Sequence, residues 1–531
     1  MPWKWWHSTK ALTFSLCATD VRMPCQIVWF KRDLRWQDHA ALAQAAARGP
    51  VRCIYIVEPG YWQLKDTALQ HFEFIRESLQ ALNLHLQSMG GCVEIHTGDA
   101  IDVFERLRQE TPFTEIHSHE ETGNAWTYAR DIQVQAWCQT HRIQWHEYPQ
   151  FGVVRRLKNR NQWQAAWEQH MQAPQVQPLD IHFARQENDL PFSMHAPAHL
   201  KHDPPHRQRG GRPLALAVLR SFLKARSLGY RGGISSPLSA PDACSRLSAY
   251  LAYGCISMRE VVQMTRAYIE ALPPQASRHR AGLQAFMSRL YWHCHFIQKL
   301  ESEPEIEWQN MHRGYDSLRE ESFNEAFFEA LKHAKTGWPM VDASVVMLRE
   351  TGWLNFRMRA MLVSVAAYPL WLHWQPVGEW LATQFLDYEP GIHWSQLQMQ
   401  SGTTGINTTR VYNPIKQAQD HDPQGLFVRR WLPAMRNVPD SWLFEPWKMP
   451  DNVRQATGTD ASSVIQIHTP LVDLSSATRT AKERLHALRK NDKVRAGKKA
   501  VIDKHASRKT FATRRTSAKS KAATSQMGFD F

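Results

Sequence analysis

The stretch Asp387-Tyr-Glu-Pro-Gly-Ile-His-Trp-Ser-Gln-Leu-Gln-Met-Gln400 decides the fold of this 531-residue chain more than any other part of it. It combines acidic residues, amide side chains and aromatic rings with few gaps, which is unusual for a segment that only fills a core. Similar residues continue through Tyr412-Asn-Pro-Ile-Lys-Gln417 and Phe427-Val-Arg-Arg-Trp-Leu-Pro433.

Residues 23–150 show the pattern of an α/β domain. Short β-type runs alternate with amphipathic runs, and in residues 69–87 apolar side chains recur at helical spacing. Strands that alternate with helices usually pair in parallel, so this order predicts a doubly wound parallel sheet. The expected strands are Gln26–Phe30, Val51–Val57, Cys92–Thr97, Glu115–His119 and Ile143–Tyr148.

Residues 211–450 show helical patterns without strand-like runs, which predicts a large all-α domain. The polar, proline-rich segment 151–210 predicts a connector that runs over the surface between the two domains. Residues 1–22 are expected to be an N-terminal extension. The helices expected up to residue 400 are Pro213–Leu223, Ser257–Leu272, Arg280–Leu300, Phe323–His333, Pro339–Glu350, Asn355–Leu370 and Gly378–Phe385.

The net charge of +14 is concentrated near the C-terminus. Between Arg479 and Lys521 there are 16 Lys or Arg residues and three acidic residues. Residues 451–531 are therefore predicted to form a basic, disordered tail. Such a tail either binds polyanions such as DNA without sequence preference or only keeps the protein soluble, and both interpretations stay open.

The composition, with 43% hydrophobic and 21% charged residues, is typical of a soluble globular protein. No apolar run approaches the roughly 18 residues that span a bilayer, so no membrane partner is expected. The eight Cys are scattered without metal-binding spacing, which favours reduced thiols and a cytoplasmic location. The pairs His117/His119 and His293/His295 lack further ligands at metal spacing, so no metal site is predicted.

The first strand ends in the charged sequence Ile27-Val-Trp-Phe-Lys-Arg-Asp-Leu-Arg35. Charges at the carboxyl end of a parallel strand lie where ligands bind in open α/β sheets. From the residues alone, an Arg–Asp pair that fastens the loop is the better interpretation. No glycine-rich phosphate loop follows the strand, which argues against a nicotinamide-type site.

Five stretches together resemble the photolyase/cryptochrome family, in particular bacterial DNA photolyase-like flavoproteins. The resemblance covers about residues 26–450, and no cysteine cluster of the iron–sulfur branch is present in the C-terminal half. It implies an FAD-binding all-α domain behind an α/β domain that holds an antenna chromophore in some relatives. The stretches are Ile27–Arg35, Cys244–Gly254, Phe286–Phe296, Lys335–Ala343 with Thr351–Arg359, and Asp387–Gln400.

The resemblance also implies roles for single residues around FAD. Arg359 and Asp387 match residues that flank the isoalloxazine ring, and His393 falls where relatives place the residue facing flavin N5. Backbone and hydroxyl groups near a helix start would hold the diphosphate. The expected FAD contacts are Tyr230, Ser245, Leu247, Ser248, Arg359, Asp387, Glu389 and His393.

For the substrate, Trp292 matches a tryptophan that stacks on a flipped pyrimidine in relatives. The expected DNA-binding residues are Trp292, Arg289 and Met399. Three positions depart from the family pattern, because Arg289 replaces a usual Glu, Phe356 a usual Asn, and Met399 a second stacking Trp. Leu397 replaces the first Trp of the electron-supply chain. Electrons are therefore expected to reach the flavin through Trp374, Trp380, Trp394 or Trp353.

The resemblance implies a light-driven flavoprotein, with a DNA photolyase acting on UV-damaged DNA as the first hypothesis. A cryptochrome-like blue-light photoreceptor without repair activity is the second, and a flavin-free nucleic-acid-binding protein is the third. The final residues, Gln526-Met-Gly-Phe-Asp-Phe531, resemble a motif by which bacterial repair proteins bind the replication sliding clamp. A clamp partner is a further expectation.

Overall fold

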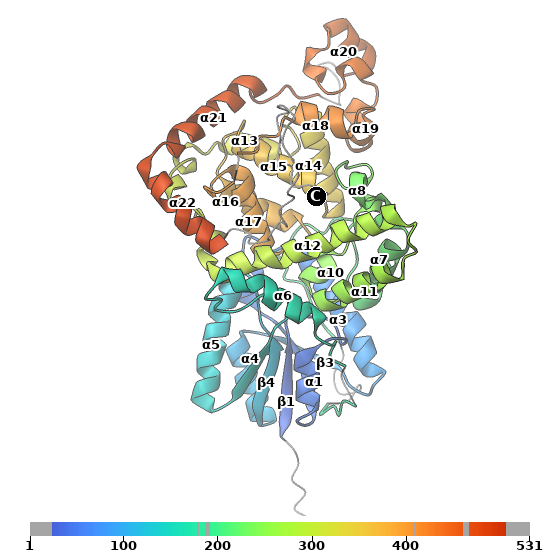
Figure 1. The fold of residues 1–531 in the computed structure, drawn as a ribbon, viewed down its shortest axis with the longest axis vertical. Coiled ribbons are helices and arrows are strands. Elements are labelled where there is room, and N and C mark those ends of the chain that lie inside the picture. Colours follow the sequence, from blue (N-terminus) through green and yellow to red (C-terminus); the bar gives the residue numbers. More distant parts are fainter. Residues whose placement is uncertain (1–23, 178–179, 186–191, 408, 460–466, 506–531) are drawn as a thin grey trace, which may run out of the picture.

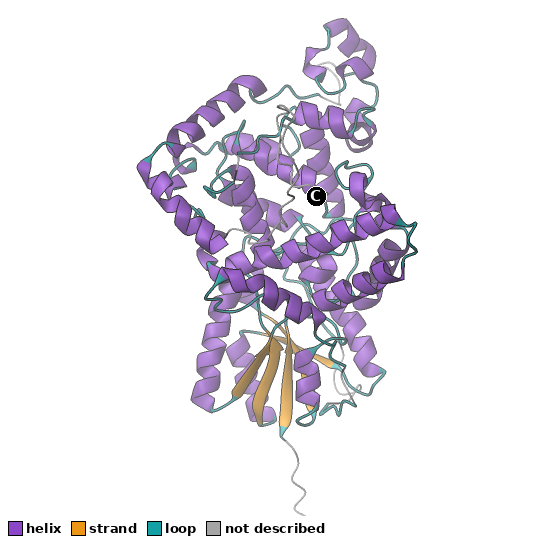
Figure 2. Ribbon diagram, viewed as in Figure 1, coloured by secondary structure: helices purple, strands orange, loops and turns teal. Residues whose placement is uncertain are grey.

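The computed structural model describes residues 24–177, 180–185, 192–407, 409–459 and 467–505. An α/β domain carries a larger helical domain on top of it, as Figures 1 and 2 show. The helices of the upper domain lie beyond the end at which the strands finish, so the domain boundary faces the carboxyl edge of the sheet. The predicted two-domain architecture is confirmed.

The sheet contains five parallel strands in the order β3-β2-β1-β4-β5, as predicted for a doubly wound domain. Every residue of β1 and β2 is buried, because helices cover both faces of a parallel sheet. The strands are β1 (Cys25–Phe30), β2 (Val51–Val57), β3 (Val93–Thr97), β4 (Phe113–His119) and β5 (Gln144–Tyr148). The flanking helices are α1 (Ala40–Ala46), α2 (Pro59–Trp62), α3 (Leu69–Gln87), α4 (Ala100–Glu110) and α5 (Ala125–His141).

The helical domain is organised around the long helix α12 (Ser277–Ser302), on which α17 (Pro390–Ser401) packs. A Cβ atom on Gly391 of α17 would lie 2.6 Å from Cα of Ile297, so glycine permits this close crossing. The other helices are α7 (Arg212–Lys224), α8 (Tyr230–Gly233), α9 (Ala240–Ala243), α10 (Ser248–Ala252), α11 (Met258–Ala271), α13 (Glu325–Lys332), α14 (Pro339–Thr351), α15 (Phe356–Ala367), α16 (Trp374–Gln384), α18 (Pro414–His421) and α19 (Leu426–Trp431).

The segment between the domains is more ordered than a surface connector. It contains α6 (Trp163–Gln172), which packs against α11 and buries Trp163, Trp167 and Met171. These three residues are spaced four apart and form one apolar stripe, but the polar and proline-rich flanks concealed the pattern. The prediction of a simple connector over residues 151–210 is therefore wrong for this helix.

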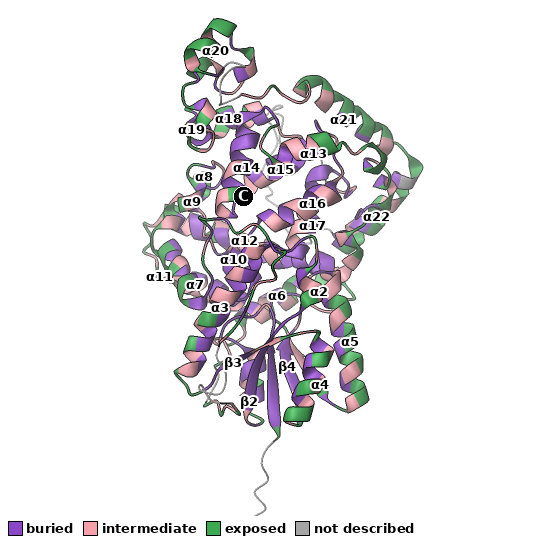
Figure 3. Cartoon of the chain, turned by 180° about the vertical axis from the view of Figure 1, so that it is seen from behind, coloured by how far each residue is buried: buried purple, intermediate pink, exposed green. Residues whose placement is uncertain are grey.

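The prediction of a disordered tail is also wrong for the tail residues that the structure describes. Helices α20 (Asp451–Thr457), α21 (Leu474–Arg489) and α22 (Asp492–His505) follow the core, and α21 buries Ala481 and Leu485. The abundance of Lys and Arg hid an amphipathic pattern, because only a few residues form the apolar side of α21. Figure 3 shows exposed residues along the outer sides of α21 and α22.

Two other expectations concern residues outside the described ranges. The N-terminal extension, residues 1–22, falls wholly within residues 1–23, and the clamp motif at Gln526–Phe531 lies in residues 506–531. Within the described ranges, no helix combines the length and the apolar character needed to cross a membrane.

Candidate functional site

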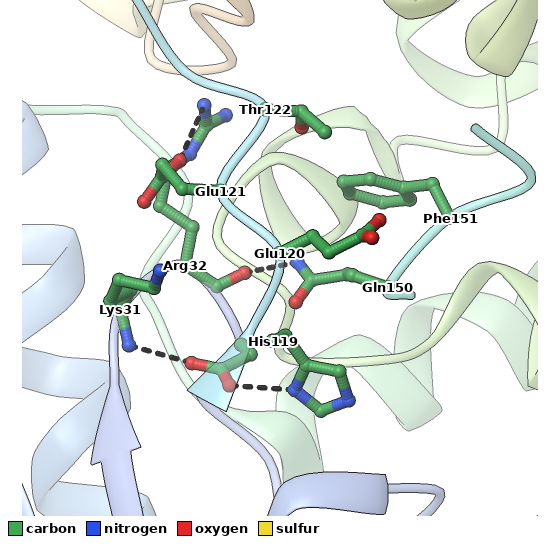
Figure 4. Close-up of a pocket in the computed structure, with 9 residues that line it drawn as sticks. Lys31, Arg32, His119, Glu120, Glu121, Thr122, Gln150 and Phe151 are labelled. Atoms are coloured by element: carbon green, nitrogen blue, oxygen red, sulfur yellow. Dashed lines mark hydrogen bonds and ion pairs between the residues drawn. The ribbon is translucent and has the colours of Figure 1, made fainter. Parts of the chain in front are cut away.

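The end of β1 does not carry the predicted Arg–Asp pair. Asp33 is held instead by His119 (Figure 4), whose Nδ1 lies 2.7 Å from Oδ2, and by His39, whose Nε2 lies 2.9 Å from the same oxygen. The backbone N–H of Lys31 donates to Oδ1. Burial favours the neutral acid, but the two histidines outweigh it and keep the pKa of Asp33 well below its usual value. Arg32 is therefore free of Asp33 and points elsewhere.

Arg32 joins the two domains. Its guanidinium donates to Glu389, the residue before α17, and lies 4.0 Å from Glu121, which lines the same small pocket in Figure 4. A Cβ on Gly254, whose φ is +64°, would lie 2.2 Å from the carbonyl oxygen of Arg32, so the backbones of these two segments are in direct contact. Glu389 was predicted to contact the cofactor, and the structure places it at this domain junction. Its Oε1 has no hydrogen-bond partner among the described residues.

Arg359 and Asp387, which are both expected to flank the isoalloxazine ring, form an ion pair in the helical domain. Arg359 Nη2 lies 2.9 Å from Asp387 Oδ2, and Arg359 Nε donates to the carbonyl oxygen of Leu354. Burial would raise the pKa of Asp387, but Arg359, the Ser248 hydroxyl and Arg246 lower it, so the group is a carboxylate. Asp387 Oδ1 is buried and has no partner among the described residues. A buried acceptor in this state indicates a place for an outside donor.

The predicted phosphate-binding segment is a tight loop before α10. Arg246 has a φ of +61°, an unusual conformation for a residue with a side chain. Arg226 supports the loop by donating to the carbonyl oxygens of Cys244 and Ser245. Leu247 is buried, whereas Ser245 and Ser248 are half-buried and remain at the loop surface. The loop therefore presents hydroxyl groups, and the guanidinium of Arg226 fixes its backbone.

Four arginines surround this loop. Burial raises the pKa of Cys244 to about 11, although Arg246, Arg359, Arg226 and Arg289 all act to lower it. Burial likewise lowers the pKa of Arg246 to about 10. Asp387 and Asp242 are the acidic residues that act on these arginines, so positive charge is in excess. This excess, with the hydroxyl groups and the open oxygen of Asp387, fits the diphosphate and ring of FAD.

Tyr230 belongs to the same cluster. It is buried against Phe222 and Phe286, and its hydroxyl is hydrogen-bonded to the side chain of Arg289 on α12. Burial raises the pKa of Tyr230, so the hydroxyl keeps its proton. The structure therefore connects Tyr230, predicted to bind FAD, with Arg289, predicted to face DNA.

His393 lies on α17 within electrostatic range of the Arg359–Asp387 pair. Its Nε2 is 2.9 Å from the carbonyl oxygen of Gly378, which can only accept, so Nε2 carries the proton and Nδ1 is an acceptor. Burial lowers the pKa of His393 to about 4, so the ring is neutral at pH 7. The residue thus offers one hydrogen-bond acceptor near the predicted flavin ring.

The predicted electron-transfer tryptophans divide into two groups. Trp374 contacts Trp394 at a centroid distance of 5.8 Å, and Trp394 contacts His393 at 4.9 Å. Trp380 instead meets Phe328, and Trp353 stacks under the guanidinium of Arg246. The structure brings together Trp374, Trp394 and His393, and it leaves Trp380 outside this series.

The predicted substrate residues lie on α12 and α17. Trp292 is half-buried, one helical turn after Arg289, and contacts His295 and Phe296. Met399 is buried on α17. The sequence analysis missed Arg226 and Arg246 as parts of the site. Arg246 lies inside the quoted loop and could have been found there, whereas no motif marks Arg226.

Two family models match this chain. The model described as DNA photolyase matches residues 26–158, and the FAD-binding domain of DNA photolyase matches residues 286–487. The deoxyribodipyrimidine photo-lyase of Escherichia coli (strain K12) is 26% identical over 471 residues, which cover 80% of this chain and 92% of that protein. The cryptochrome DASH of Gloeobacter violaceus is 25% identical over 456 residues, which cover 80% of this chain and 88% of that protein.

Solved structures agree in fold. A bacterial class III photolyase from Agrobacterium tumefaciens superposes with a TM-score of 0.75 at 22% identity, covering 90% of this chain and 100% of that one. An archaeal photolyase from Sulfolobus tokodaii, solved with two FAD molecules, has a TM-score of 0.68 at 23% identity. The match covers 87% of this chain and 100% of that one. With both family models matched and the FAD-type cluster in place, the chain belongs to the photolyase/cryptochrome family.

Proposed function

We propose that this protein is a DNA photolyase that repairs UV-induced pyrimidine dimers with light. The observation that carries the proposal is the contact between Arg289 and Tyr230, one helical turn before Trp292. It places a half-buried tryptophan beside the cluster that fits FAD, so a flipped base stacked on Trp292 would lie close to the flavin.

In this proposal the protein mainly binds and orients. Bound FAD in its reduced form supplies, on absorbing light, the electron that splits the dimer. Arg359 and Asp387 fix the ring through charge-assisted hydrogen bonds, and Arg226 and Arg246 support the diphosphate loop. His393 keeps a neutral ring with Nδ1 as the acceptor. None of these residues needs to transfer a proton during the electron transfer.

We further propose that electrons reach the flavin through Trp394 and Trp374, which compensates for Leu397. The support is the ring-to-ring series from His393 to Trp394 to Trp374. The test compares Trp374→Phe with Trp380→Phe, because Trp380 lies on the same helix but outside the series. Slower photoreduction with an added thiol in Trp374→Phe alone supports this route, and equal rates in both variants exclude it.

For DNA, the proposed contacts are Trp292, Arg289, Met399 and the basic helices α21 and α22, whose exposed Lys and Arg would meet phosphates. We also propose a second chromophore in the α/β domain, as the two FAD molecules in the Sulfolobus tokodaii structure suggest. Extracting the pigment from the purified protein would identify this chromophore. A cytoplasmic location agrees with buried thiols such as Cys138 and Cys294.

A cryptochrome-like photoreceptor is the second candidate function. It is favoured by Arg289, Phe356 and Met399, which replace residues that contact the lesion in repair enzymes. The family match does not separate the two functions, because the similar proteins include a photolyase and a cryptochrome.

The deciding experiment uses purified, photoreduced protein and oligonucleotides that carry one cyclobutane dimer or one (6-4) product. Light-dependent restoration of either lesion, absent in the dark, supports repair and names the substrate. FAD that is bound and reducible without repair of either lesion supports the photoreceptor. A protein that purifies without flavin would contradict both.

A further inference from the structure

Two clusters in the α/β domain bring three metal-binding side chains together, and the hydrogen bonds distinguish them. One contains Asp33, His39 and His119, and the other contains Glu115, His117 and His146. In each cluster the ligand atoms lie within 4.8 Å of one another. Neither cluster belongs to the flavin site, and sequence spacing did not reveal either as a set of ligands.

The cluster at Asp33 is a hydrogen-bond network. The backbone N–H of Leu42 donates to Nδ1 of His39 at 3.0 Å, so Nε2 must carry the proton, and Nε2 lies 2.9 Å from Oδ2 of Asp33. A metal at Nε2 would force that proton onto Nδ1, against the N–H of Leu42. This cluster therefore cannot take a metal without losing the first hydrogen bond of α1.

The second cluster lies on one face of the edge of the sheet. His117 of β4 and His146 of β5 are directly paired in register, and Glu115 precedes His117 by two residues. Side chains alternate along strands, so all three point to the same side. Glu115 Oε2 lies 2.9 Å from Nε2 of His146 and 3.5 Å from Nε2 of His117.

These separations fit a tetrahedral metal ion once the imidazole rings of His117 and His146, which are stacked at a centroid distance of 4.8 Å, turn toward it. Zinc bonds of 2.0–2.2 Å at tetrahedral angles place ligand atoms about 3.4 Å apart, between the two observed values. Gln26 Oε1 lies 3.0 Å from Nε2 of His117, and its amide nitrogen is turned away to the carbonyl oxygen of Pro24. Gln26 Oε1 or a water molecule is therefore positioned to complete the coordination.

The tautomer of His117 can change where that of His39 cannot. Nδ1 of His117 lies 3.0 Å from the hydroxyl of Tyr148, which can accept as well as donate. When Nε2 binds the metal, its proton moves to Nδ1 and is donated to the Tyr148 oxygen. Tyr148 is only partly buried, so its own proton can turn to water. The ring stays neutral, and no proton is gained or lost by it.

We propose that Glu115, His117 and His146 form a binding site for a divalent transition metal ion such as Zn²⁺, with Tyr148 as the outer hydrogen-bond partner. His146 is 30% exposed, which gives access from solvent, whereas His117 is fully buried. Arg48, 3.4 Å from Glu115 and 38% exposed, swings out when the cation binds. The ion ties β5, the edge strand, to β4.

The test uses the full-length, FAD-loaded protein after chelator treatment, with Zn²⁺ titrated against a chromophoric chelator. The variants are His146→Gln and Glu115→Gln. The matched control is His141→Gln, because His141 also faces a glutamate, Glu105 at 3.6 Å, but belongs to neither cluster. Other histidines contribute equally to all variants, so the difference between variants and control reports this site.

The expected result is one Zn²⁺ equivalent more in the parent and in His141→Gln than in the two ligand variants. Tyr148→Phe should weaken binding about ten-fold, the effect usual for an outer hydrogen-bond partner. Co²⁺ bound there should give visible bands without a thiolate charge-transfer band. Zn²⁺ should raise Tm in the parent but not in His146→Gln. Equal stoichiometry and affinity in the parent and His146→Gln would overturn the proposal.

Discussion

Two groups of buried charges, one in each domain, differ in their charge balance. In the sheet domain, Arg52 and Glu94 are both 1% exposed and share two hydrogen bonds of 2.6 and 2.8 Å. Around the loop before α10 of the helical domain, four arginines produce an excess of positive charge. In the first group each buried charge has a partner, so removing one partner is costly, whereas the second group has uncompensated positive charge and is suited to bind an anion.

The largest effect is expected from breaking the balanced pair. Glu94→Ala leaves the buried Arg52 with only the exposed Glu110, 3.5 Å away, and should cost about 3–5 kcal/mol of folding stability. FAD content per folded molecule should not change, because the pair lies in the sheet domain. Urea unfolding and the flavin-to-protein absorbance ratio measure the two quantities.

A double variant sharpens this test. Replacing both members with apolar residues of similar length, Arg52→Met with Glu94→Leu, should recover much of the stability, because no unpaired charge remains. A double variant as unstable as Glu94→Ala would mean that the pair contributes through packing and not through charge.

The second-largest effect is expected from a substitution in the arginine cluster around the loop before α10. Asp387→Ala removes the carboxylate that Arg359 binds and that is expected to hold the flavin, and hydrogen bonds to charged groups contribute about 1.5–3 kcal/mol. FAD affinity should therefore fall roughly ten- to 150-fold, as equilibrium dialysis can measure. The control is Asp131→Asn, which disturbs the pair with Lys31 in the sheet domain. Equal flavin loss in both variants would show that the effect is general unfolding.

The sequence predicted the elements whose pattern is periodic. Strand β2 and helix α3 have the predicted bounds, because apolar residues recur there at strand or helical spacing. The pairing of Arg359 with Asp387 could be expected only from the resemblance. No local pattern identified α6 or α21, in which a few apolar residues stand among polar ones and are buried only by tertiary packing.

Side-chain partners were the least predictable feature. Asp33 was expected to pair with an arginine but is bound by His39 and His119, which arrive from later segments of the sheet domain. The arginines around Cys244 come from four separate segments, so their common location depends on the fold. Sequence reasoning finds residues that share a motif and misses those that only the tertiary structure brings together.

The third prediction concerns Trp292, which lies one helical turn after Arg289 and is the proposed DNA-binding residue beside the arginine cluster. Trp292→Ala should weaken binding of an oligonucleotide with one pyrimidine dimer by about 1–3 kcal/mol, the value of one base stacked on an aromatic ring. FAD content should remain, because Trp292 is not among the residues that fit the flavin. Trp308→Ala is the matched control, since Trp308 is an exposed tryptophan in the same domain. Fluorescence anisotropy measures both, and equal weakening would contradict a specific stacking role.

The smallest effect concerns how α22 is held on the domain. Glu303 at the end of α12 accepts from His505 Nε2 at 2.7 Å and lies 2.9 Å from Lys504 Nζ. Burial would raise the pKa of Glu303, but these two residues lower it to about 2 from its usual 4.5. A carboxylate with a lowered pKa contributes its full stabilisation above its unfolded-state pKa and loses it as the pH falls through its folded-state pKa.

Glu303→Gln should therefore speed hydrogen exchange in residues 492–505 at pH 7, and its difference from the parent should shrink between about pH 4.5 and pH 2. Glu483→Gln, an exposed substitution on α21, serves as the control. A difference that is the same at both ends of this pH range would show that Glu303 holds α22 without its charge.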